Sequence, residues 1–542
     1  MLHIDQSRPF LSLLSFLFFS LTLSSLSAAE IKTKILIEGK ELSQTNGLNF
    51  DSHGNFYVAS IVDRSIYKID PDSGELLDKL GPELGVESPD DLVIDNNGNI
   101  YWTSYLTGEI GKLTSAKVKS TVAMLGPGVN GITIANDGSL LVSRIFFADQ
   151  IWQLDPSGIN DPVLIGEGYP GIDGIDMGSD GYLYVPLWYT GQVGRIEVST
   201  GTLEIIANGF ITPTAVKLNS TNELFVSDIL AGAIYSIDIT SGEKTIIIDD
   251  IPGVDNIAFD SEDILYFSNS DNGSLHQLKH PNNLKELTPA GLTGPSGLAL
   301  LSINENTSLF VADMFQLAEY NPINGHLRGS VDVVSAQSAA LKTPVTIAPY
   351  GDQLLITSWF ANSVQIWDPS SQQLTEEFDD FQVPIDAIEF AGDLVVSELG
   401  SGCIIRQDGQ TQSRTAMACY PSILYPGSLA AKQGTLWVAD WVQGAIYRLA
   451  EASQTLTNPV LVTSGLLMPE GLAAMPDGSL VTVETGTQRL VLIDTTQGSF
   501  SVIVEELAVG SPAPPNFVPT WIMTGIAVDD EGVIYVGEEI SH

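Results

Sequence analysis

The sequence has few basic residues and few histidines. Its 542 residues include 66 Asp and Glu but only 23 Lys and Arg, which gives a net charge of −43 at pH 7. This excess of negative charge opposes nucleic-acid phosphates and anionic membranes, so we exclude both as partners. The six histidines are scattered, and no Gly-x-Ser-x-Gly motif is present. The sequence therefore does not support a histidine-based metal site or a serine-hydrolase elbow.

Long apolar runs are absent apart from one near the N-terminus. Residues 10–23 are almost wholly apolar, Arg8 precedes them, and Ser27, Ala28 and Ala29 follow. A basic residue, a short apolar core and small residues are typical of a cleavable signal peptide, which we assign to residues 1–29. The run is too short to span a membrane comfortably, and an uncleaved N-terminal anchor is the alternative. We expect an exported protein, periplasmic or secreted, without an integral membrane domain.

The dominant feature of the sequence is a repeat of about 41 residues that recurs about twelve times. One copy begins at Gly47 and reads Gly-Leu-Asn-Phe-Asp-Ser-His-Gly-Asn-Phe-Tyr-Val-Ala-Ser, and the next begins at Asp91. Each unit predicts four short strands bounded by turn residues, which is typical of a β-propeller blade. Because a single blade cannot bury both of its faces, blades stack in rings. We predict an all-β fold of tandem β-propellers.

About twelve blades are too many for one ring, since propellers typically have four to eight. We predict two six-bladed rings, residues 30–283 and residues 284–542, with a division into seven and five as the alternative. Residues 31–39 resemble a fourth strand that lacks the first three, so they would complete the sixth blade of the first ring. Residues 284–290 would do the same for the second ring. The last repeat, however, ends after two strands.

Two further features of the repeats concern turns and cysteines. Asp-x-x-Gly turns such as residues 51–54 lack the acidic spacing of an EF-hand loop, so we assign them to turn geometry rather than to calcium. Cys403 and Cys419 are the only cysteines and fall on the third and fourth strands of one blade. In an exported protein we expect them to form a disulfide. Two free buried thiols are the alternative, because the register cannot be read from the sequence.

One column of residues suggests chemistry, namely the residue just before the glycine-apolar step that begins each innermost strand. These residues reach one mouth of the central channel. In the first ring all six carry a side-chain oxygen: Asn46, Asp90, Asn130, Asp173, Thr214 and Asp255. The corresponding residues of the second ring are Ser296, Val345, Ile385, Gly427, Glu470 and Thr524, and three of these six carry no side-chain oxygen. Turn chemistry would affect both rings alike, so the difference points to function in the first ring.

Converging carboxylate and amide oxygens suit a hard divalent cation, of which Ca²⁺ is our candidate. Polar caps around a water-filled channel are the alternative. The end of each second strand reaches the same mouth. Most polar residues at these strand ends would cap the hairpin to the following strand. Arg144 differs, because a long cation there could hold a substrate carboxylate or oxyanion. Trp188 and Tyr189 could form the wall of a pocket, with rim packing as the alternative.

Two segments resemble successive blades of the regucalcin/gluconolactonase family of six-bladed propellers. They are residues 129–140, Val-Asn-Gly-Ile-Thr-Ile-Ala-Asn-Asp-Gly-Ser-Leu, and residues 172–185, Ile-Asp-Gly-Ile-Asp-Met-Gly-Ser-Asp-Gly-Tyr-Leu-Tyr-Val. The resemblance implies a metal held by Asn130, Asp173 and Asp255, the last in place of a family Glu. The family's substrate-contacting Asn would fall at Asp90. NHL-type propellers share the turn motifs, so these motifs are weakly specific.

The resemblance implies a metal-dependent hydrolase that acts on a small-molecule lactone or related ester. The cation would polarise the carbonyl, Asp173 would be both ligand and general base, and Asn46 or Asp90 would hold substrate hydroxyls. A non-catalytic propeller that binds a sugar, peptide or protein partner is the second hypothesis. The third is a metal-independent enzyme of the strictosidine-synthase-like type, with Glu470 as its channel carboxylate. We expect a monomer.

Overall fold

The computed structural model describes residues 2–4, 32–279, 283–304, 306–332, 341–510 and 523–538. In this part of the chain nearly all regular structure is β, with short 3-10 helices at Pro82–Leu84 and Thr485–Thr487. None of its helices is long and apolar enough to cross a membrane. The predicted signal peptide, residues 1–29, lies outside the described residues except for residues 2–4. The all-β class and the tandem propeller architecture predicted from the repeat are confirmed.

The first ring is built from six four-stranded antiparallel sheets, each a meander in chain order. Their strands are β2–β5 (Leu48–Phe50, Phe56–Ser60, Ser65–Ile69, Leu76–Leu80), β6–β9 (Pro89–Ile94, Ile100–Ser104, Glu109–Leu113, Lys119–Met124), β10–β13 (Val129–Ile134, Leu140–Arg144, Gln150–Leu154, Val163–Glu167), β14–β17 (Asp176–Met177, Tyr182–Leu187, Gln192–Glu197, Thr202–Asn208), β18–β21 (Pro213–Leu218, Leu224–Asp228, Ala233–Ile237, Lys244–Ile248) and β22–β25 (Val254–Phe259, Leu265–Asn269, Leu275–Leu278, Leu284–Thr288). Each innermost strand contacts the next, and β22 contacts β2, so the six sheets form a closed circle.

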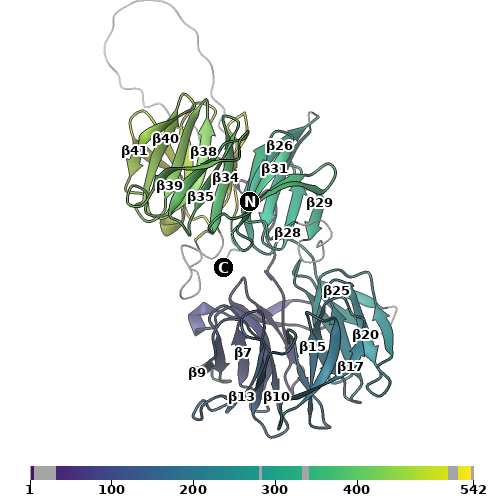
Figure 1. Cartoon of the computed structure of the whole chain (residues 1–542). Helices are drawn as coiled ribbons and strands as arrows, with labels where there is room; N and C mark the ends of the chain where they lie inside the picture. Colours follow the sequence, from purple (N-terminus) through teal and green to yellow (C-terminus); the bar gives the residue numbers. More distant parts are fainter. Residues whose placement is uncertain are drawn as a thin grey trace, which may run out of the picture.

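The second ring follows the same plan, with five four-stranded sheets and one of three strands. Their strands are β26–β29 (Pro295–Ile303, Asn306–Asp313, Gln316–Tyr320, Leu327–Asp332), β30–β33 (Thr346–Tyr350, Gln353–Ser358, Ser363–Asp368, Gln373–Phe378), β34–β37 (Pro384–Phe390, Asp393–Glu398, Cys403–Gln407, Arg414–Cys419), β38–β41 (Pro426–Lys432, Thr435–Asp440, Ala445–Glu451, Gln454–Ser464), β42–β45 (Pro469–Ala474, Leu480–Glu484, Arg489–Asp494, Ser499–Val504) and β46, β47 and β1 (Ile526–Val528, Ile534–Val536, Leu2–Ile4). Contacts between β26 and β46 close this circle. Figure 1 shows the first ring, coloured purple to teal, below the second ring, coloured teal to yellow.

The closure of the first ring differs from the sequence prediction. Leu284–Thr288 is β25, and it pairs with β24 as the fourth strand of the sixth sheet. The expected exchange, in which residues 31–39 would fill that place and residues 284–290 would complete the second ring, is wrong, and the first ring extends beyond the predicted boundary at residue 283. The physical reason is that β24 and β25 are joined by a short connection, and a local hairpin closes at a lower entropy cost than pairing with a distant segment.

The segment before β2 instead passes from one ring to the other. Leu36 is buried against Tyr320 and Tyr535 of the second ring, whereas Leu42 is buried against Leu48 in the core of the first. Residues 32–47 therefore connect the cores of the two rings.

The short last repeat gains a strand from the opposite end of the chain. β1 pairs antiparallel with β47, with Leu2 opposite Val536. The N-terminal marker accordingly lies beside the second ring in Figure 1. Because β1 falls within the predicted signal peptide, cleavage after Ala29 would remove this strand from the sheet.

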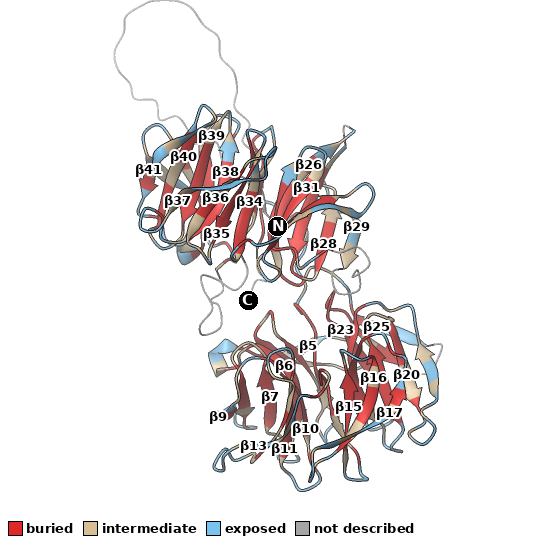
Figure 2. Ribbon diagram, in the orientation of Figure 1, coloured by how far each residue is buried: buried red, intermediate tan, exposed pale blue. Residues whose placement is uncertain are grey.

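The core is divided into layers between neighbouring sheets. Trp102 in β7 is fully buried against Ile66, Leu80 and Val86, and equivalent clusters lie between the other sheets. Second strands such as Ile100–Ser104 are buried at every position, because both faces of each sheet are covered. Figure 2 shows this burial along the strands, with exposed residues confined mainly to turns and outer strands. Fully burying one such apolar side chain contributes about 1.5–3 kcal/mol.

An apolar cluster and the connecting segment join the two rings. Val62, Met314 and Val345 are buried in one cluster, and Leu106 and Trp359 pack against it. These residues follow second strands or precede first strands, so the rings meet on the mouth side of each. A disulfide also joins Cys403 and Cys419, which lie directly opposite each other in β36 and β37.

Candidate functional site

The mouth of the first ring is shaped by irregular starts of the innermost strands. The register of β10 with β11 shifts between Val129 and Ile132, and that of β22 with β23 shifts between Val254 and Ile257. These shifts fall on the column residues predicted from the sequence, Asn130 and Asp255. A β-bulge leaves a residue out of the ladder and redirects its side chain, so the column can point toward the channel.

Hydroxyl groups of the preceding blade hold the backbone of the column. Ser143 in β11 donates a hydrogen bond of 2.8 Å to the carbonyl of Asp173, and Thr103 in β7 donates one to the carbonyl of Asn130. The carbonyl of Asp255 accepts a bond of 2.8 Å from Thr214. These three column residues are therefore positioned by the preceding blade of the ring as well as by their own hairpins.

Three carboxylates of the column come together in the mouth. Asp90, Asp173 and Asp255 are 2%, 6% and 8% exposed. Burial, and then the negative charges of Asp255 and Asp90, raises the pKa of Asp173 well above its usual value. Burial and the charge of Asp255 raise the pKa of Asp90 in the same way, and burial raises the pKa of Asp255 to about 7. Asp90 and Asp173 thus each lie within electrostatic reach of Asp255, in the same part of the mouth.

Asn130 belongs to the same group, since its side chain makes a hydrogen bond that lowers the pKa of Asp173 and partly offsets the burial. Asp90 Oδ2 is buried and has no hydrogen-bond partner in the described part of the chain. No group of three or more His, Cys, Asp or Glu side chains among the described residues is arranged to hold a metal ion. The set proposed from the sequence has one amide and two carboxylates, and metal binding by Asn130, Asp173 and Asp255 stays a prediction.

Asp91 and Lys217 were missed by the sequence analysis. Asp91 is 1% exposed and accepts hydrogen bonds from the backbone N–H groups of Leu92 (2.8 Å) and Ile132 (3.2 Å), which ties β6 to β10. Burial raises its pKa, and the charge of the buried Lys217 in β18 opposes this. Asp91 stands at the position that Gly47, Gly131 and Gly174 hold in three other blades of this ring, and the charged residue in place of glycine was the available signal.

Other residues proposed from the sequence have partners outside the carboxylate group. Asn46 accepts a hydrogen bond of 2.7 Å from the side-chain amide of Asn256. Arg144 donates to the carbonyl of Pro127 (2.9 Å), in the loop that leads into β10.

A carboxylate at the end of a second strand contacts the loop that leads into the first strand of the same blade. Asp228 accepts the N–H groups of Ile211 (2.7 Å) and Thr212 (2.8 Å) before β18. Asp228 also accepts the N–H of Ala231 (3.1 Å) in the hairpin between β19 and β20, which agrees with the hairpin-capping role predicted for polar residues at the ends of second strands. In the second ring, Glu470 accepts the N–H of Thr524 (2.9 Å), so it joins two neighbouring blades.

Aromatic side chains stand beside the carboxylates. The ring of Phe146 meets Trp188 edge-on at 5.5 Å and lies 6.2 Å from Tyr189. Tyr105 is close to the acidic group, because burial and then the charges of Asp90 and Asp173 raise its pKa. Of these residues, Trp188 and Tyr189 were singled out from the sequence. Phe146 and Tyr105 lie in loops without a repeating pattern.

The second ring has a channel cavity of about 330 Å³, lined by residues such as Thr346, Asp386 and Ser428. Asp386 accepts the N–H groups of Ala387 (2.9 Å) and Leu429 (2.8 Å). Burial raises its pKa to about 6, against these hydrogen bonds. It therefore ties two innermost strands together, as Asp91 does in the first ring.

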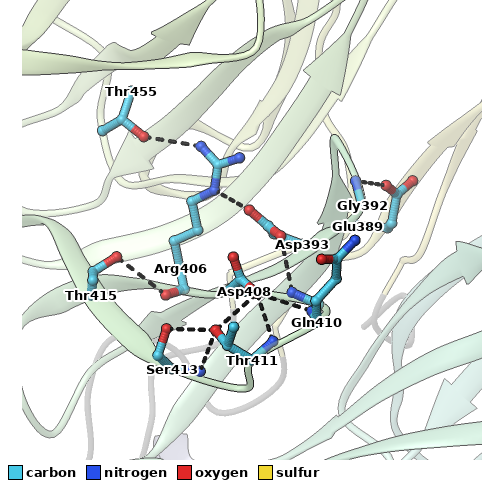
Figure 3. Close-up of polar contacts among 11 residues, drawn as sticks. Glu389, Gly392, Asp393, Arg406, Asp408, Gln410, Thr411, Ser413, Thr415 and Thr455 are labelled. Carbon is cyan, nitrogen blue, oxygen red and sulfur yellow. Dashed lines mark hydrogen bonds and ion pairs between the residues drawn. The ribbon is translucent and has the colours of Figure 1, made fainter.

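Acidic residues in the turns have a structural role. Figure 3 shows Asp408 in the turn after β36, where its Oδ1 accepts the N–H groups of Gln410 (3.0 Å) and Thr411 (2.7 Å). Asp51 likewise accepts the N–H groups of His53 (2.8 Å) and Asn55 (2.9 Å). These bonds match the turn geometry assigned to the Asp-x-x-Gly motifs.

No family model and no curated protein matches the chain. Among solved structures, a streptogramin B lyase is similar at 19% identity and a TM-score of 0.39, over 51% of this chain and 93% of that one. A virginiamycin B lyase from Staphylococcus aureus is similar at 18% identity and a TM-score of 0.38, over 50% and 92%. The extracellular domain of the two-component system BT4673 from B. thetaiotaomicron is similar at 14% identity and a TM-score of 0.36, over 86% and 72%. These neighbours are propeller-type folds, the class that the chain's own sheets establish.

Proposed function

We propose that the first ring is a metal-dependent hydrolase that acts on a lactone or related ester. The observation that carries this proposal is the group of buried carboxylates Asp90, Asp173 and Asp255, whose pKa values are all raised by burial. Burying several negative charges together is costly unless they are protonated or neutralised by a cation.

The chemistry of the side chains suits a hard divalent cation. Asn130, Asp173 and Asp255 would hold it, because carboxylate and amide oxygens are the ligands that Ca²⁺ prefers. Asp90 Oδ2, buried and without a partner among the described residues, faces the same need for positive charge or a donated hydrogen bond. When bound, the cation would polarise the ester carbonyl and lower the pKa of the carboxylates around it.

The chain's own residues would then perform the hydrolysis. The oxygen of a water molecule forms a bond to the carbonyl carbon and gives a proton to Asp173. The ester C–O bond breaks, and the leaving alkoxide takes the proton from Asp173. Asp90 would accept a hydrogen bond from a substrate hydroxyl. Asn46 is the weaker candidate for that role, because its side-chain oxygen already accepts from Asn256.

The regucalcin/gluconolactonase resemblance supports this proposal through Asn130 and Asp173, which match that family's ligands in residue type. We propose that the protein is exported through residues 1–29 and acts as a monomer on a small-molecule substrate.

The proposal is tested by metal analysis of the purified protein, followed by turnover of a lactone panel with and without chelator. We expect a bound divalent cation, and hydrolysis that the chelator abolishes and added Ca²⁺ restores. Lactone hydrolysis that survives complete removal of metal would contradict the proposal, and loss of this activity in Glu470→Gln would then favour the strictosidine-synthase-like alternative.

A second function, binding without catalysis, is favoured by the aromatic residues at the mouth. A non-catalytic propeller could hold a sugar or peptide against Trp188 and Tyr189. Absence of turnover on every lactone and ester, with saturable binding of one such ligand, would identify this function instead.

A further inference from the structure

The loops around the mouth of the first ring expose large apolar side chains. Phe146, Phe147, Tyr189 and Ile211 are 47%, 63%, 50% and 62% exposed. Each lies between a second and a third strand or just before a first strand, which places all of them on the mouth side. Contiguous exposed apolar surface of this kind is typical of a binding site. We call Tyr105, Phe146, Phe147, Trp188 and Tyr189 the aromatic surface.

The backbone is built to hold these rings in place. A Cβ at Gly128 would lie 2.7 Å from Cδ2 of Phe147, and a Cβ at Gly171 would lie 3.0 Å from Cδ2 of Tyr189. The aromatic side chains of Phe147 and Tyr189 therefore pack against glycines, where a larger residue would collide with them. Phe146 has a φ of 64°, in the left-handed region that a bulky residue rarely adopts. Backbone strain of this kind persists only where the surroundings impose it, and it is concentrated at functional sites.

The aromatic surface adjoins the carboxylates. The backbone N–H groups of Trp188 and Tyr189 donate to the carbonyls of Gly171 (2.8 Å) and Pro170 (3.1 Å), in the loop that leads to Asp173. The charges of Asp90 and Asp173 also raise the pKa of Tyr105 after burial. Asp173 is also among the charges that raise the pKa of Tyr189, after burial and Asp149. An ester positioned for attack beside Asp173 would therefore have its remaining part next to these rings.

The second ring continues this apolar surface. Leu106, the neighbour of Tyr105, packs against the cluster of Val62 and Val345 that joins the rings, and Trp359 packs against the same cluster. Trp359 stacks on Phe360 with 4.2 Å between the centroids of the two aromatic rings, and Phe360 is 54% exposed. Apolar side chains thus extend from the mouth of the first ring to a loop of the second, between β31 and β32.

We infer that the substrate of the first ring is an ester or lactone with an aryl or alkyl group, which lies against the aromatic surface and reaches Phe360 of the second ring. The inference rests on the proposed function and narrows its substrate class. A sugar lactone could stack one face on Trp188 or Tyr189 but has no apolar group to cover the exposed Phe147 and Phe360, whereas an aryl or alkyl group would cover them. The second ring then has a role in specificity.

The test compares γ-phenyl-γ-butyrolactone with γ-butyrolactone as substrates of the full chain. Phe146→Ser and Phe360→Ser are the variants. Ile159→Ser and Ile323→Ser are the controls, because Ile159 and Ile323 are 84% and 79% exposed and lie in turns between third and fourth strands, away from the mouth. We expect the ratio of kcat/KM for the phenyl lactone to kcat/KM for γ-butyrolactone to fall about tenfold in each Phe variant and to match wild type in both controls.

Equal turnover of the phenyl lactone by wild type and both Phe variants would overturn the inference while leaving the hydrolase intact. Calorimetric binding of the phenyl lactone to Asp173→Asn provides a readout that does not need turnover. If no lactone is hydrolysed but the phenyl lactone binds, and Phe146→Ser weakens that binding, the hydrolase proposal fails and the aromatic surface stands as a ligand site. If the phenyl lactone neither binds nor reacts, the inference fails as well.

Discussion

The side-chain amide of Asn256 donates a hydrogen bond of 2.7 Å to the side-chain oxygen of Asn46, although 210 residues separate them in sequence. Both residues are buried. Asn46 lies just before the first sheet and Asn256 in the innermost strand of the sixth, so this bond crosses the joint where the first ring closes.

Removing that bond should weaken the closure. We expect Asn256→Ala to lower the free energy of unfolding of the first ring by about 1–3 kcal/mol, because Asn46 Oδ1 is left buried without its donor. Urea denaturation of Asn256→Ala, Asn46→Ala and the double variant would measure the coupling between the two residues. If the effects of the two substitutions simply add, the bond does not stabilise the joint.

The hydroxyl of Ser143 should affect metal binding through Asp173. Ser143→Ala removes the donor to the carbonyl of Asp173, and we expect metal affinity to fall about tenfold, as for other groups that orient ligands. Ser143→Thr should restore it, since Thr103 has this role in the preceding blade. Ser397→Ala is the matched control, because Ser397 donates to the carbonyl of Asp386 in the second ring. A similar loss of metal affinity in both alanine variants would exclude a specific role for Ser143.

Asp173 and Asp255 should respond differently to replacement by asparagine. Asp173→Asn should reduce turnover by about 10²–10⁴-fold, because an amide cannot accept a proton from water, and excess metal should not repair it. Asp255→Asn should mainly weaken metal binding, so added cation should restore turnover. The measurement is a metal titration of lactone hydrolysis by both variants. Equal rescue would leave Asp173 as a ligand only.

The stability of the junction between the two rings should depend on pH in the alkaline range, because Lys40 is partly buried there. Burial, opposed by the charges of Asp313 and Glu286, lowers the pKa of Lys40 from 10.5 to about 8. The unfolded chain therefore binds more protons than the folded one between pH 8 and about 10.5, so this group's contribution to stability rises with pH in that window.

We expect the contribution of Lys40 to appear as a difference between wild type and Lys40→Met. The difference in unfolding free energy should shift in favour of wild type as the pH is raised from 8 to 10, because the methionine does not titrate. Thermal unfolding of both proteins across this range is the measurement. Parallel pH profiles would show that Lys40 keeps its ordinary pKa.

The disulfide should stabilise the third blade of the second ring. Cys403 and Cys419 are separated by 16 residues, and closing a loop of that length in the unfolded chain is worth about 3 kcal/mol. We expect the double variant Cys403→Ser/Cys419→Ser to lose about that much by denaturant unfolding. A reducing agent should destabilise wild type by a similar amount and leave the variant unchanged. Equal sensitivity of both proteins to the reducing agent would contradict this.

The sequence predicted what the repeat imposes. Strand boundaries follow Gly and Asp turns, and the column from Asn46 to Asp255 follows from where each innermost strand begins. The carboxylate group could be found in this way because identical positions of successive blades converge in a ring. The repeat also located the disulfide blade, whose register only the structure provides.

Other features could not be found from a repeating pattern. Asp91 stands at a position that is glycine in only about half of the copies, and the loops with Tyr105 and Phe146 share no residue pattern with the corresponding loops of other blades. The pairing of β25 was missed for a different reason. Fourth strands are exposed and irregular in composition, so composition alone does not distinguish residues 31–39 from Leu284–Thr288 as the partner of β24. The short connection between β24 and β25 decides the pairing.

The bond from Ser143 to the carbonyl of Asp173 runs from one blade into the next, as does the bond from Thr103 to Asn130. The structural unit that positions each of these residues is therefore the interface between two blades. It consists of the second strand of one blade and the first strand of the next. An engineer who transplants a ligand-bearing blade from another propeller would need to bring the upstream hydroxyl with it. A change designed at one hairpin would otherwise displace the side chain of the following blade.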